Sequence, residues 1–453
     1  MKQELKWALK FAVALVVPLA LLPGYADAVP SFARQTGENC VSCHVSFPEL
    51  TAFGRYFKLT GYTLGERQSV PLAMMGQVGL TDAMRPLDNS GAEVVPHNNA
   101  LRLQQASVFV AGKVNDNVGG FIQITYDPDA HHTSADNIDL RAVGGTRLAG
   151  KELIYGATLH NNPTVQDVWN STPAFGFPWF TSTFAPSGPP VSTLIDGGLA
   201  TAVAGMGGYA YWNKSLYGEL SFYRTADGGF SALRAGNAVD PGSRITLKGL
   251  NPYWRLAYNH DWGDHSLMVG TYGMQAQIYA DPLDKTSAIK KFTDTALDAQ
   301  YQYITDVHTV TAQASWIHER QRFDAALLGD PTDPAAVGGG APFNASNTLN
   351  TAKGKLTYFY RRMYGATLGY FSTTGSADAG LATLDVNTGN VVSNVPNTNG
   401  YILDLQYVPV QNARLHLQYT LFNKFNGSST NIDGNGRNAR DNNSLFLGVW
   451  FSY

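Results

Sequence analysis

The residues best able to do chemistry are Cys40 and Cys43, which are separated by Val41 and Ser42 and followed directly by His44. Two thiols at this spacing can each add across one vinyl group of a haem, and the imidazole beside the second thiol can reach the iron as proximal ligand. They are the only two cysteines among 453 residues. We therefore predict one covalently attached haem c, with Cys40 and Cys43 as thioether links and His44 as the axial ligand of the iron.

Three other uses of these cysteines fit the surrounding sequence less well. A structural zinc site needs four ligands at tetrahedral angles, and no second cluster of Cys or His lies nearby. A thioredoxin-like redox pair needs a strand-helix-strand context, which this segment flanked by glycine and proline does not provide. A disulfide across so short a loop would be strained, and it would leave His44 without a role.

Residues 1–28 have the pattern of a cleaved secretory signal peptide. Three lysines precede an apolar run over 11–22, and Ala26-Asp27-Ala28 supplies small residues before a cleavage point. The apolar run is too short to span a bilayer as a helix. Export would carry both thiols to the periplasm, where c-type haem is attached and unpaired cysteines rarely persist. The signal and the motif therefore predict the same compartment.

The composition of the remaining chain favours an outer-membrane β-barrel. Aromatic residues make up 12% and charged residues only 15%, with 46 glycines and 23 tyrosines, yet no run of 18 apolar residues suggests a transmembrane helix. Strands of such barrels conceal their hydrophobicity because lipid-facing and lumen-facing residues alternate. The runs at 297–303, 309–316 and 414–421 alternate in this way.

The spacing of these runs predicts about sixteen antiparallel strands between Val70 and Tyr453, which is an all-β fold. Short and long connections alternate, as expected for short periplasmic turns and long external loops. Long connections are expected at about 161–198, 225–249, 321–346 and 372–399, and short turns near Asn115-Asp116, Gly150-Lys151, Asn213-Lys214, Gly263-Asp264, Thr305-Asp306, Arg361-Arg362 and Gln411-Asn412. A break in the alternation predicts a bulge near Gln104-Gln105.

Residues 29–69 lie between the signal peptide and the barrel of residues 70–453. After the motif a helix is expected, with Pro48 in its first turn, an apolar stripe at Leu50, Phe53 and Phe57, and Gly61 at its end. About forty residues bury too little surface to hold a haem domain together unaided. We therefore expect a short, mainly helical haem segment that plugs or caps the barrel.

The motif belongs to a longer pattern, which consists of residues 30–37, Cys40 to His44, Pro48-Glu49-Leu50, residues 53–58 and Gly61-Tyr62-Thr63. This pattern resembles the N-terminal signature of the fused monohaem c-type cytochrome-porins of iron-oxidising bacteria. The stretch from Asn161 to Asp167 and on to Phe177 also resembles a loop of that family. The resemblance is specific in the N-terminal segment, and over the barrel it rests on architecture and length.

The resemblance implies an outer-membrane iron oxidase of a Gram-negative bacterium. Such an electron-transfer protein, of the iron:cytochrome c oxidoreductase type, takes electrons from extracellular Fe(II) and passes them to a periplasmic cytochrome c or copper protein. The alternatives are a haem-plugged porin and a conduit for extracellular electron transfer from another donor, such as a mineral or an electrode. Outer-membrane lipid is a further expected partner, whereas a net charge of −3 without a basic patch predicts no nucleic-acid partner.

Other candidate residues each have a functional interpretation and an ordinary structural one. The sixth position on the iron could be vacant or bound by water, or it could be filled by a residue that is otherwise an ordinary part of a strand or loop: Met74, Met75, His97, His131, His132 or His160. An external loop could dock Fe(II) or simply be solvated, with candidates Asp127, Asp129, His131, His132, Asp136 and Asp139. Lumen residues Lys353, Lys355, Arg414, Asp298 and Asp404 could line a pathway or merely follow the strand alternation. Arg34, Arg55 and Lys58 could pair with haem propionates or anchor the segment to the wall.

Overall fold

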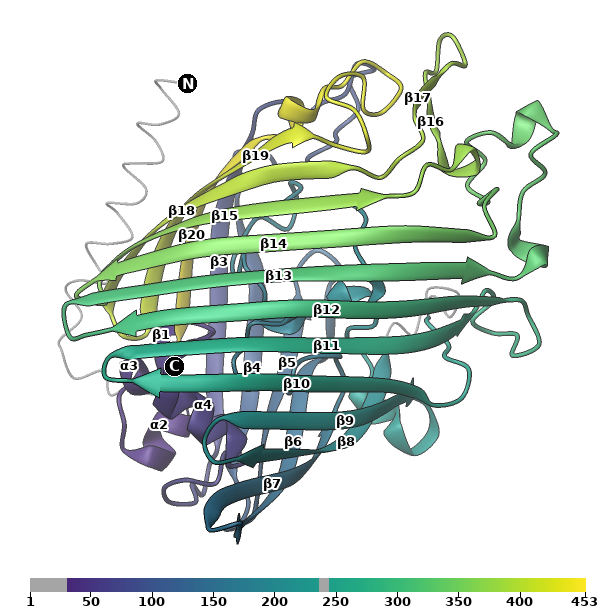
Figure 1. The fold of residues 1–453 in the computed structure, drawn as a ribbon. Coiled ribbons are helices and arrows are strands. Elements are labelled where there is room, and N and C mark those ends of the chain that lie inside the picture. Colours follow the sequence, from purple (N-terminus) through teal and green to yellow (C-terminus); the bar gives the residue numbers. More distant parts are fainter. Residues whose placement is uncertain (1–30, 236–243) are drawn as a thin grey trace.

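The computed structural model describes residues 31–235 and 244–453, so the predicted signal peptide lies outside the described residues. Sixteen antiparallel strands close into a single barrel (Figure 1). The barrel closes where β20 pairs with β3, as in Leu447 opposite Leu80. The strands are β3 (Leu72–Ala83), β4 (Leu101–Lys113), β5 (Val118–Asp127), β6 (His132–Leu148), β7 (Lys151–His160), β8 (Val203–Trp212), β9 (Leu216–Thr225), β10 (Asn251–Trp262), β11 (His265–Tyr279), β12 (Ile289–Ile304), β13 (His308–Phe323), β14 (Ser346–Tyr360), β15 (Tyr364–Gly375), β18 (Thr398–Val410), β19 (Ala413–Lys424) and β20 (Ser444–Ser452).

The predicted alternation of connections is confirmed. All seven predicted short turns join consecutive strands at one end of the barrel, for example at Gly263-Asp264 between β10 and β11. The four predicted long connections follow β7, β9, β13 and β15 at the other end. One of them, after β15, carries a small hairpin of β16 (Thr383–Leu384) and β17 (Val391–Ser393).

The predicted bulge in β4 is also confirmed. Gln77 lies opposite Gln105 and Val78 lies opposite Leu103, so Gln104 has no partner on β3. The extra residue turns the buried Gln104 side chain inward, where its Oε1 accepts hydrogen bonds from the backbone and the hydroxyl of Thr183. The bulge therefore serves to hold a segment inside the barrel.

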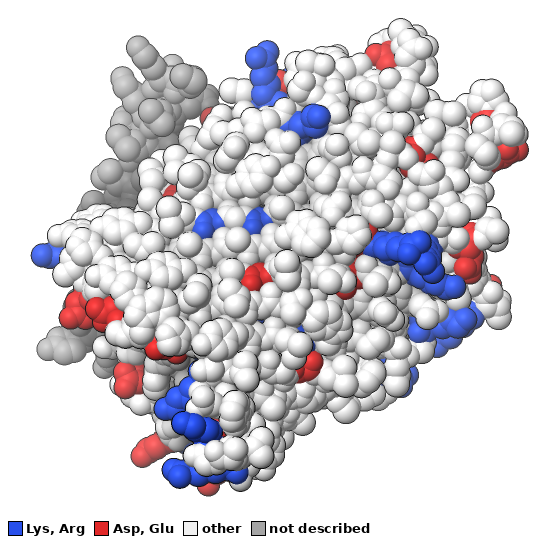
Figure 2. Space-filling view, in the orientation of Figure 1, with Lys and Arg blue, Asp and Glu red and all other residues white. Residues whose placement is uncertain are grey.

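The two faces of the wall have opposite chemistry. Leu356, Leu368 and Leu403 form one cross-strand row on β14, β15 and β18 and are about half exposed on the outer surface. Their inward neighbours, such as Thr357 and Thr367, are buried and polar. Figure 2 shows that the belt between the two ends of the strands carries few charged side chains. An apolar exterior around a polar interior is the architecture of a transmembrane β-barrel.

The helices are short. Among the described residues, no helix combines the length and the apolar character that crossing a bilayer would need. The N-terminal segment contains α2 (Ser31–Thr36), α3 (Cys40–Cys43), a hairpin of β1 (His44–Ser46) and β2 (Glu49–Leu50), and α4 (Ala52–Leu59). In Figure 1 these elements lie at the short-turn end of the barrel.

The expected helix after the motif exists, but its predicted start at Pro48 is wrong. Pro48 lies in the turn between β1 and β2, and α4 begins at Ala52 because the Thr51 hydroxyl caps it by accepting from the Gly54 backbone at 3.2 Å. The predicted stripe is therefore also wrong in part, since Leu50 belongs to β2 and Phe53 is exposed. Gly61 follows the end of the helix with φ of 68°, as predicted for a terminating glycine.

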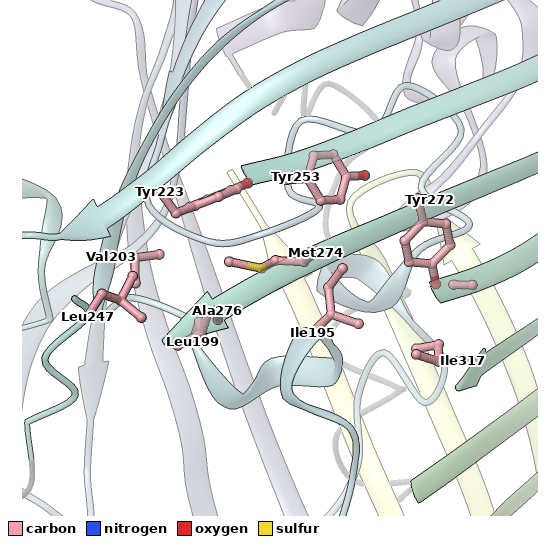
Figure 3. Close-up of a cluster of buried hydrophobic side chains, with 11 residues drawn as sticks. Ile195, Leu199, Val203, Tyr223, Leu247, Tyr253, Tyr272, Met274, Ala276 and Ile317 are labelled. Atoms are coloured by element: carbon pink, nitrogen blue, oxygen red, sulfur yellow. The ribbon is translucent and has the colours of Figure 1, made fainter. Parts of the chain in front are cut away.

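The connection over residues 161–202, called the inner loop below, folds into the lumen. It was expected to be an external loop, yet Trp169, Phe180 and Leu199 are all at least 97% buried. Its residues contact opposite walls, because Asp167 pairs with Arg255 on β10 while Phe180 packs on Phe446 of β20. Figure 3 shows Ile195 and Leu199 of this loop beside side chains of β9, β10 and β11. A barrel of this size is wide enough to hold such a segment.

The lipid-facing row generates a stability prediction. We expect Leu368→Arg to destabilise the folded barrel by about 2–4 kcal/mol, since this residue lies mid-strand on the outer face, where an arginine would meet hydrocarbon. Urea unfolding in lipid vesicles measures the difference. Leu283→Arg, in the exposed connection between β11 and β12, is the control and should leave stability unchanged. Equal stability of the two variants would contradict a lipid-facing belt.

Candidate functional site

The motif lies against the short turns of the barrel. The Cys40 backbone donates to Gln411 Oε1 at 3.2 Å, in the turn between β18 and β19. Arg362, in the turn between β14 and β15, donates from Nη1 to the Val41 carbonyl at 2.6 Å. Two barrel turns therefore fix the first half of the motif at this mouth.

The motif itself forms one helical turn. Cys40 and Cys43 open and close α3, and residues three apart on a helix share a face. Neither thiol is in a disulfide. Burial raises the pKa of both thiols, and that of Cys43 reaches about 11 with further contributions from Cys40 and Glu38. Both side chains therefore stay neutral at physiological pH.

His44 follows the helix and begins β1. Its ring packs against Phe47 at 4.6 Å between centroids, and its buried Nδ1 atom has no hydrogen-bond partner in the described part of the chain. Burial, assisted by the nearby Arg414 cation, lowers the pKa of His44 to about 4. Two free thiols can form thioether bonds to haem vinyl groups, and a neutral imidazole beside them can donate a nitrogen to the iron, so the motif offers the groups that a c-type haem requires. The residues present thus fit the predicted group.

Helix α4 packs directly onto the motif. A Cβ at Gly54 would lie 2.2 Å from the Cys43 carbonyl oxygen, so only glycine allows this approach. At the start of α4, the Thr51 backbone donates to the same carbonyl at 2.9 Å and its hydroxyl donates to the Ser42 carbonyl at 2.5 Å. The backbone of the motif is therefore fixed on one side by α4 and on the other by the barrel turns.

Two of the three residues considered for haem propionates anchor the segment instead. Arg55 is buried and donates to Gln302 Oε1, to Ser266 Oγ at 2.8 Å and to Asp261 at 3.4 Å. The Lys58 ammonium donates to inner-loop acceptors: the Val165 and Asp167 carbonyls at 2.7 and 2.6 Å and Asn170 Oδ1 at 2.8 Å. Arg34 is exposed and donates to the Leu72 carbonyl at the start of β3.

The five candidate lumen residues all have polar partners within the described part of the chain. Lys355 forms a buried ion pair with Glu49 of β2 and lies 4.1 Å from the Trp179 ring centroid. Arg414 Nη1 donates to the Phe47 carbonyl at 3.1 Å. The other three pairs are Lys353 with Asp196 at 2.7 Å, Asp298 with Arg255 at 2.8 Å and Asp404 with His416 at 3.2 Å. These charges connect the wall to the N-terminal segment, to the inner loop or to a neighbouring strand.

A cavity of about 300 Å³ remains between the inner loop and the wall of β13, β14 and β15. Its polar lining includes Asp196, Gln313, Ser315 and Lys353, and it extends to Lys355. Because Lys355 pairs with Glu49, the cavity ends beside the hairpin that begins at His44.

The six candidate iron-docking residues do not share one external loop. Asp136 and Asp139 belong to β6, and Asp139 is fully buried in the lumen, where it pairs with Arg141 at 2.8 Å. The connection itself spans only residues 128–131. Asp127, the last residue of β5, accepts hydrogen bonds from the backbone of the connection, and Asp129 pairs with Arg102. Among the described residues, no three or more His, Cys, Asp or Glu side chains gather as a metal site. The expectation treated a strand as part of the loop because polar lumen residues resemble loop residues.

The sixth-ligand candidates are widely scattered. Met74 faces outward on β3, whereas Met75 faces inward and is buried. His97 packs on Phe184 in the connection after β3, and His131 and His132 lie at the start of β6, far from the short turns. His160, at the end of β7, is buried, with hydrogen bonds from both ring nitrogens to Thr158 and Tyr223.

Sequence reasoning missed His416. This lumen-facing residue of β19 is 1% exposed, and its Nδ1 lies 3.2 Å from both carboxylate oxygens of Asp404. Within residues 31–235 and 244–453, its Nε2 has no hydrogen-bond partner. The strand alternation predicted an inward side chain. Its pairing with Asp404 depends on the register between β18 and β19, which the sequence did not reveal.

Among known proteins, the chain is similar to solved structures of low sequence identity. No family model and no curated protein matches the chain. Solved structures that are similar include the outer-membrane channel DcaP of Acinetobacter baumannii (14% identity, 84% of this chain and 96% of that one, TM-score 0.43). Another is an anion-selective porin from Comamonas acidovorans (10% identity, 84% and 98%, TM-score 0.44). At these identities and TM-scores the likeness does not extend to function.

The Glu49–Lys355 pair generates a prediction about how the N-terminal segment is held. We expect Lys355→Met to loosen this segment by about 3–5 kcal/mol, because it leaves the Glu49 carboxylate buried without its cation. Limited proteolysis within residues 31–69 measures the loosening, and Glu49→Gln in the same chain should restore most of the protection. Lys285→Met, which removes an exposed pair with Asp227, is the control. Unchanged protection in Lys355→Met would refute this anchoring.

Lys58 generates a prediction about pH. Burial lowers the pKa of Lys58 from 10.5 to about 7, with Asp139 partly opposing the shift. Between these values the released segment binds a proton that the docked segment has lost, so docking gains stability as the pH rises from about 7 towards 10.5. Hydrogen exchange of the α4 amides, corrected for intrinsic rates, should slow over this range in the native chain. Lys58→Met should show no such trend, and faster exchange at high pH in the native chain would be the opposite of what we expect.

Proposed function

We propose that the protein is an electron-transfer barrel of the outer membrane. Its N-terminal segment would carry one haem c on Cys40 and Cys43 with His44 as proximal ligand. It would oxidise extracellular Fe(II) and pass the electron to a soluble periplasmic cytochrome c or copper protein. One observation carries the proposal: two free thiols and a neutral imidazole are built into a segment that is bonded into the mouth of the barrel.

The filling of the lumen supports transfer of electrons over transfer of large solutes. The inner loop crosses the barrel from Asp167, paired with Arg255 on β10, to Phe180, packed against β20. The N-terminal segment meets this loop through Lys58 and through Asn170, which donates to the Pro48 carbonyl at 2.8 Å. An electron can pass such a packed layer, whereas a bulky solute cannot.

Aromatic rings extend from the motif into this layer. The His44 and Phe47 centroids lie 4.6 Å apart, Phe47 and Trp450 lie 6.0 Å apart, and Trp450 and Phe180 lie 6.2 Å apart. These contacts join the motif, the wall and the inner loop without a gap. When bound, haem supplies a one-electron iron couple, so each Fe(II) outside would be oxidised to Fe(III) as one electron enters the protein.

The residues around the motif would control the site by excluding water and fixing the imidazole. Cys40, Glu49 and Leu50 are buried, and Phe47 covers one side of the His44 ring. Burial keeps His44 neutral, which is the form that binds a metal. Axial ligation and burial are the means by which a protein tunes the potential of a haem.

The cavity favours a second candidate, a haem-plugged porin for small solutes. Its 300 Å³ and its polar lining could admit a small hydrophilic molecule as far as Lys355. That function predicts solute flux that survives Cys40→Ala, whereas the electron-transfer proposal predicts a barrel closed to solutes and an electron flow that Cys40→Ala abolishes.

The test is expression in a host with haem-maturation machinery, followed by Fe(II) titration of outer-membrane vesicles. We expect haem staining of the native chain and reduction of its haem by Fe(II), both lost in Cys40→Ala. His44→Ala should abolish Fe(II)-driven reduction, while His308→Ala, an exposed histidine at the start of β13, should behave as the native chain. An absence of haem would overturn the proposal. If dithionite reduces the haem but Fe(II) does not reduce it at any pH tested, iron is rejected as the donor.

A further inference from the structure

The Asp404–His416 pair has the form of an oriented metal ligand. Both residues face the lumen and are 1% exposed, and His416 Nδ1 lies 3.2 Å from each carboxylate oxygen of Asp404. Its Nε2 is buried and has no hydrogen-bond partner among the residues that the structure describes. A buried nitrogen without a partner is costly, and in a native structure it is explained by strain, by a functional role, or by a bound water or ion. Metal-bound histidines commonly direct their other nitrogen to a carboxylate, as His416 does.

The comparison with His160 shows that burial alone does not leave a nitrogen unsatisfied. His160 is equally buried in the lumen, yet its Nδ1 bonds to Thr158 at 3.2 Å and its Nε2 to Tyr223 at 2.5 Å. His416 thus differs from another buried histidine of the same lumen by an open ligand position.

His416 lies next to the wall residues that hold the motif. Ser46, two residues after His44, donates to Gln406 Oε1 at 3.3 Å, and Gln406 is the cross-strand partner of His416. The same Gln406 donates from Nε2 to Asp404 at 2.8 Å. Two residues before His416 on the same face of β19, Arg414 donates to the Phe47 carbonyl. The hairpin that begins at His44 is therefore bonded at two consecutive residues, Ser46 and Phe47, to the neighbours of His416.

Aromatic side chains pack around His416, and their flat rings can stack on a porphyrin. Trp450 stacks on the His416 ring at 6.5 Å between centroids, and Phe180 meets it edge-on at 5.4 Å. Trp450 also contacts Phe47, which packs on His44. Gly448 makes room for Phe180, since a Cβ there would lie 2.3 Å from that ring. Ring contacts through Phe47 and Trp450 thus connect the two histidines, and the Arg414 guanidinium lies over both of these rings.

We propose that His416 is the second axial ligand of the haem iron and that Asp404 holds it in the ligating orientation. This inference rests on the proposed attachment of haem at Cys40 and Cys43. Both iron ligands are then histidines, one from the N-terminal segment and one from the barrel, so the haem joins the two parts of the chain. Among the earlier candidates, only Met75 is also buried and inward-facing near the short turns. Its cross-strand partner Ser452 donates to the carbonyl of Asn412, which lies in the turn between β18 and β19.

The experiment is absorption and electron paramagnetic resonance spectroscopy of the purified ferric holoprotein and its variants. The native chain should be six-coordinate and low-spin. His416→Ala should become high-spin, and added imidazole should restore the low-spin signal. His416→Met should stay six-coordinate but gain the sulfur-to-iron charge-transfer band and a higher reduction potential. His160→Ala is the matched control, and its spin state should equal that of the native chain.

The outcomes separate this inference from the proposed function. A folded His416→Ala variant that stays low-spin, or a Met75→Leu variant that alone turns high-spin, would overturn the assignment of His416 while leaving covalent haem in place. A native chain that is folded and carries no haem would overturn both. If His416→Ala does not fold, the His416→Met spectrum decides, because an unchanged spectrum would show that position 416 does not touch the iron.

Discussion

The arrangement depends on one constraint, which is that the N-terminal segment cannot satisfy its own buried polar groups. About forty residues bury too little apolar surface to fix a structure by themselves. The barrel supplies what is missing: Lys355 neutralises Glu49, the β11 and β12 side chains Ser266 and Gln302 accept from Arg55, and inner-loop carbonyls accept from Lys58. The conformation of Cys40 to His44 is thus a property of the whole chain rather than of the motif.

The inner loop extends this principle across the lumen. Arg255 is fully buried between Asp167 of the loop and Asp298 of β12, and it lies over the ring of Trp169. Burying charges is expensive unless each one is paired, so a wall that carries such residues must be met by a segment with complementary groups. A sixteen-stranded barrel would otherwise enclose a water-filled channel. Here the polar lumen is the surface on which the loop and the N-terminal segment are ordered.

The barrel could be predicted from the sequence because strand alternation is a local signal. The seven short turns, the bulge at Gln104 and the inward face of β19 all follow from neighbouring residues. The start of α4 was mispredicted because Pro48, a residue that suits the first turn of a helix, lies here in the turn between β1 and β2. Thr51 caps the helix three residues later. The position of the inner loop was missed because its packing is with strands far away in sequence. Asp139 and His416 acquire their roles through register with other strands, which no local pattern encodes.

The central claim is that Cys40 and Cys43 carry a covalent haem inside a barrel-bound segment. The most direct measurement is mass spectrometry of the peptide that contains residues 40–44, cut from protein made in a host with haem-maturation machinery. Our account predicts a single peptide whose mass is raised by one haem, with no free thiol and no disulfide. A peptide with two unmodified thiols, or with Cys40 joined to Cys43, obtained from a correctly folded barrel, would contradict it.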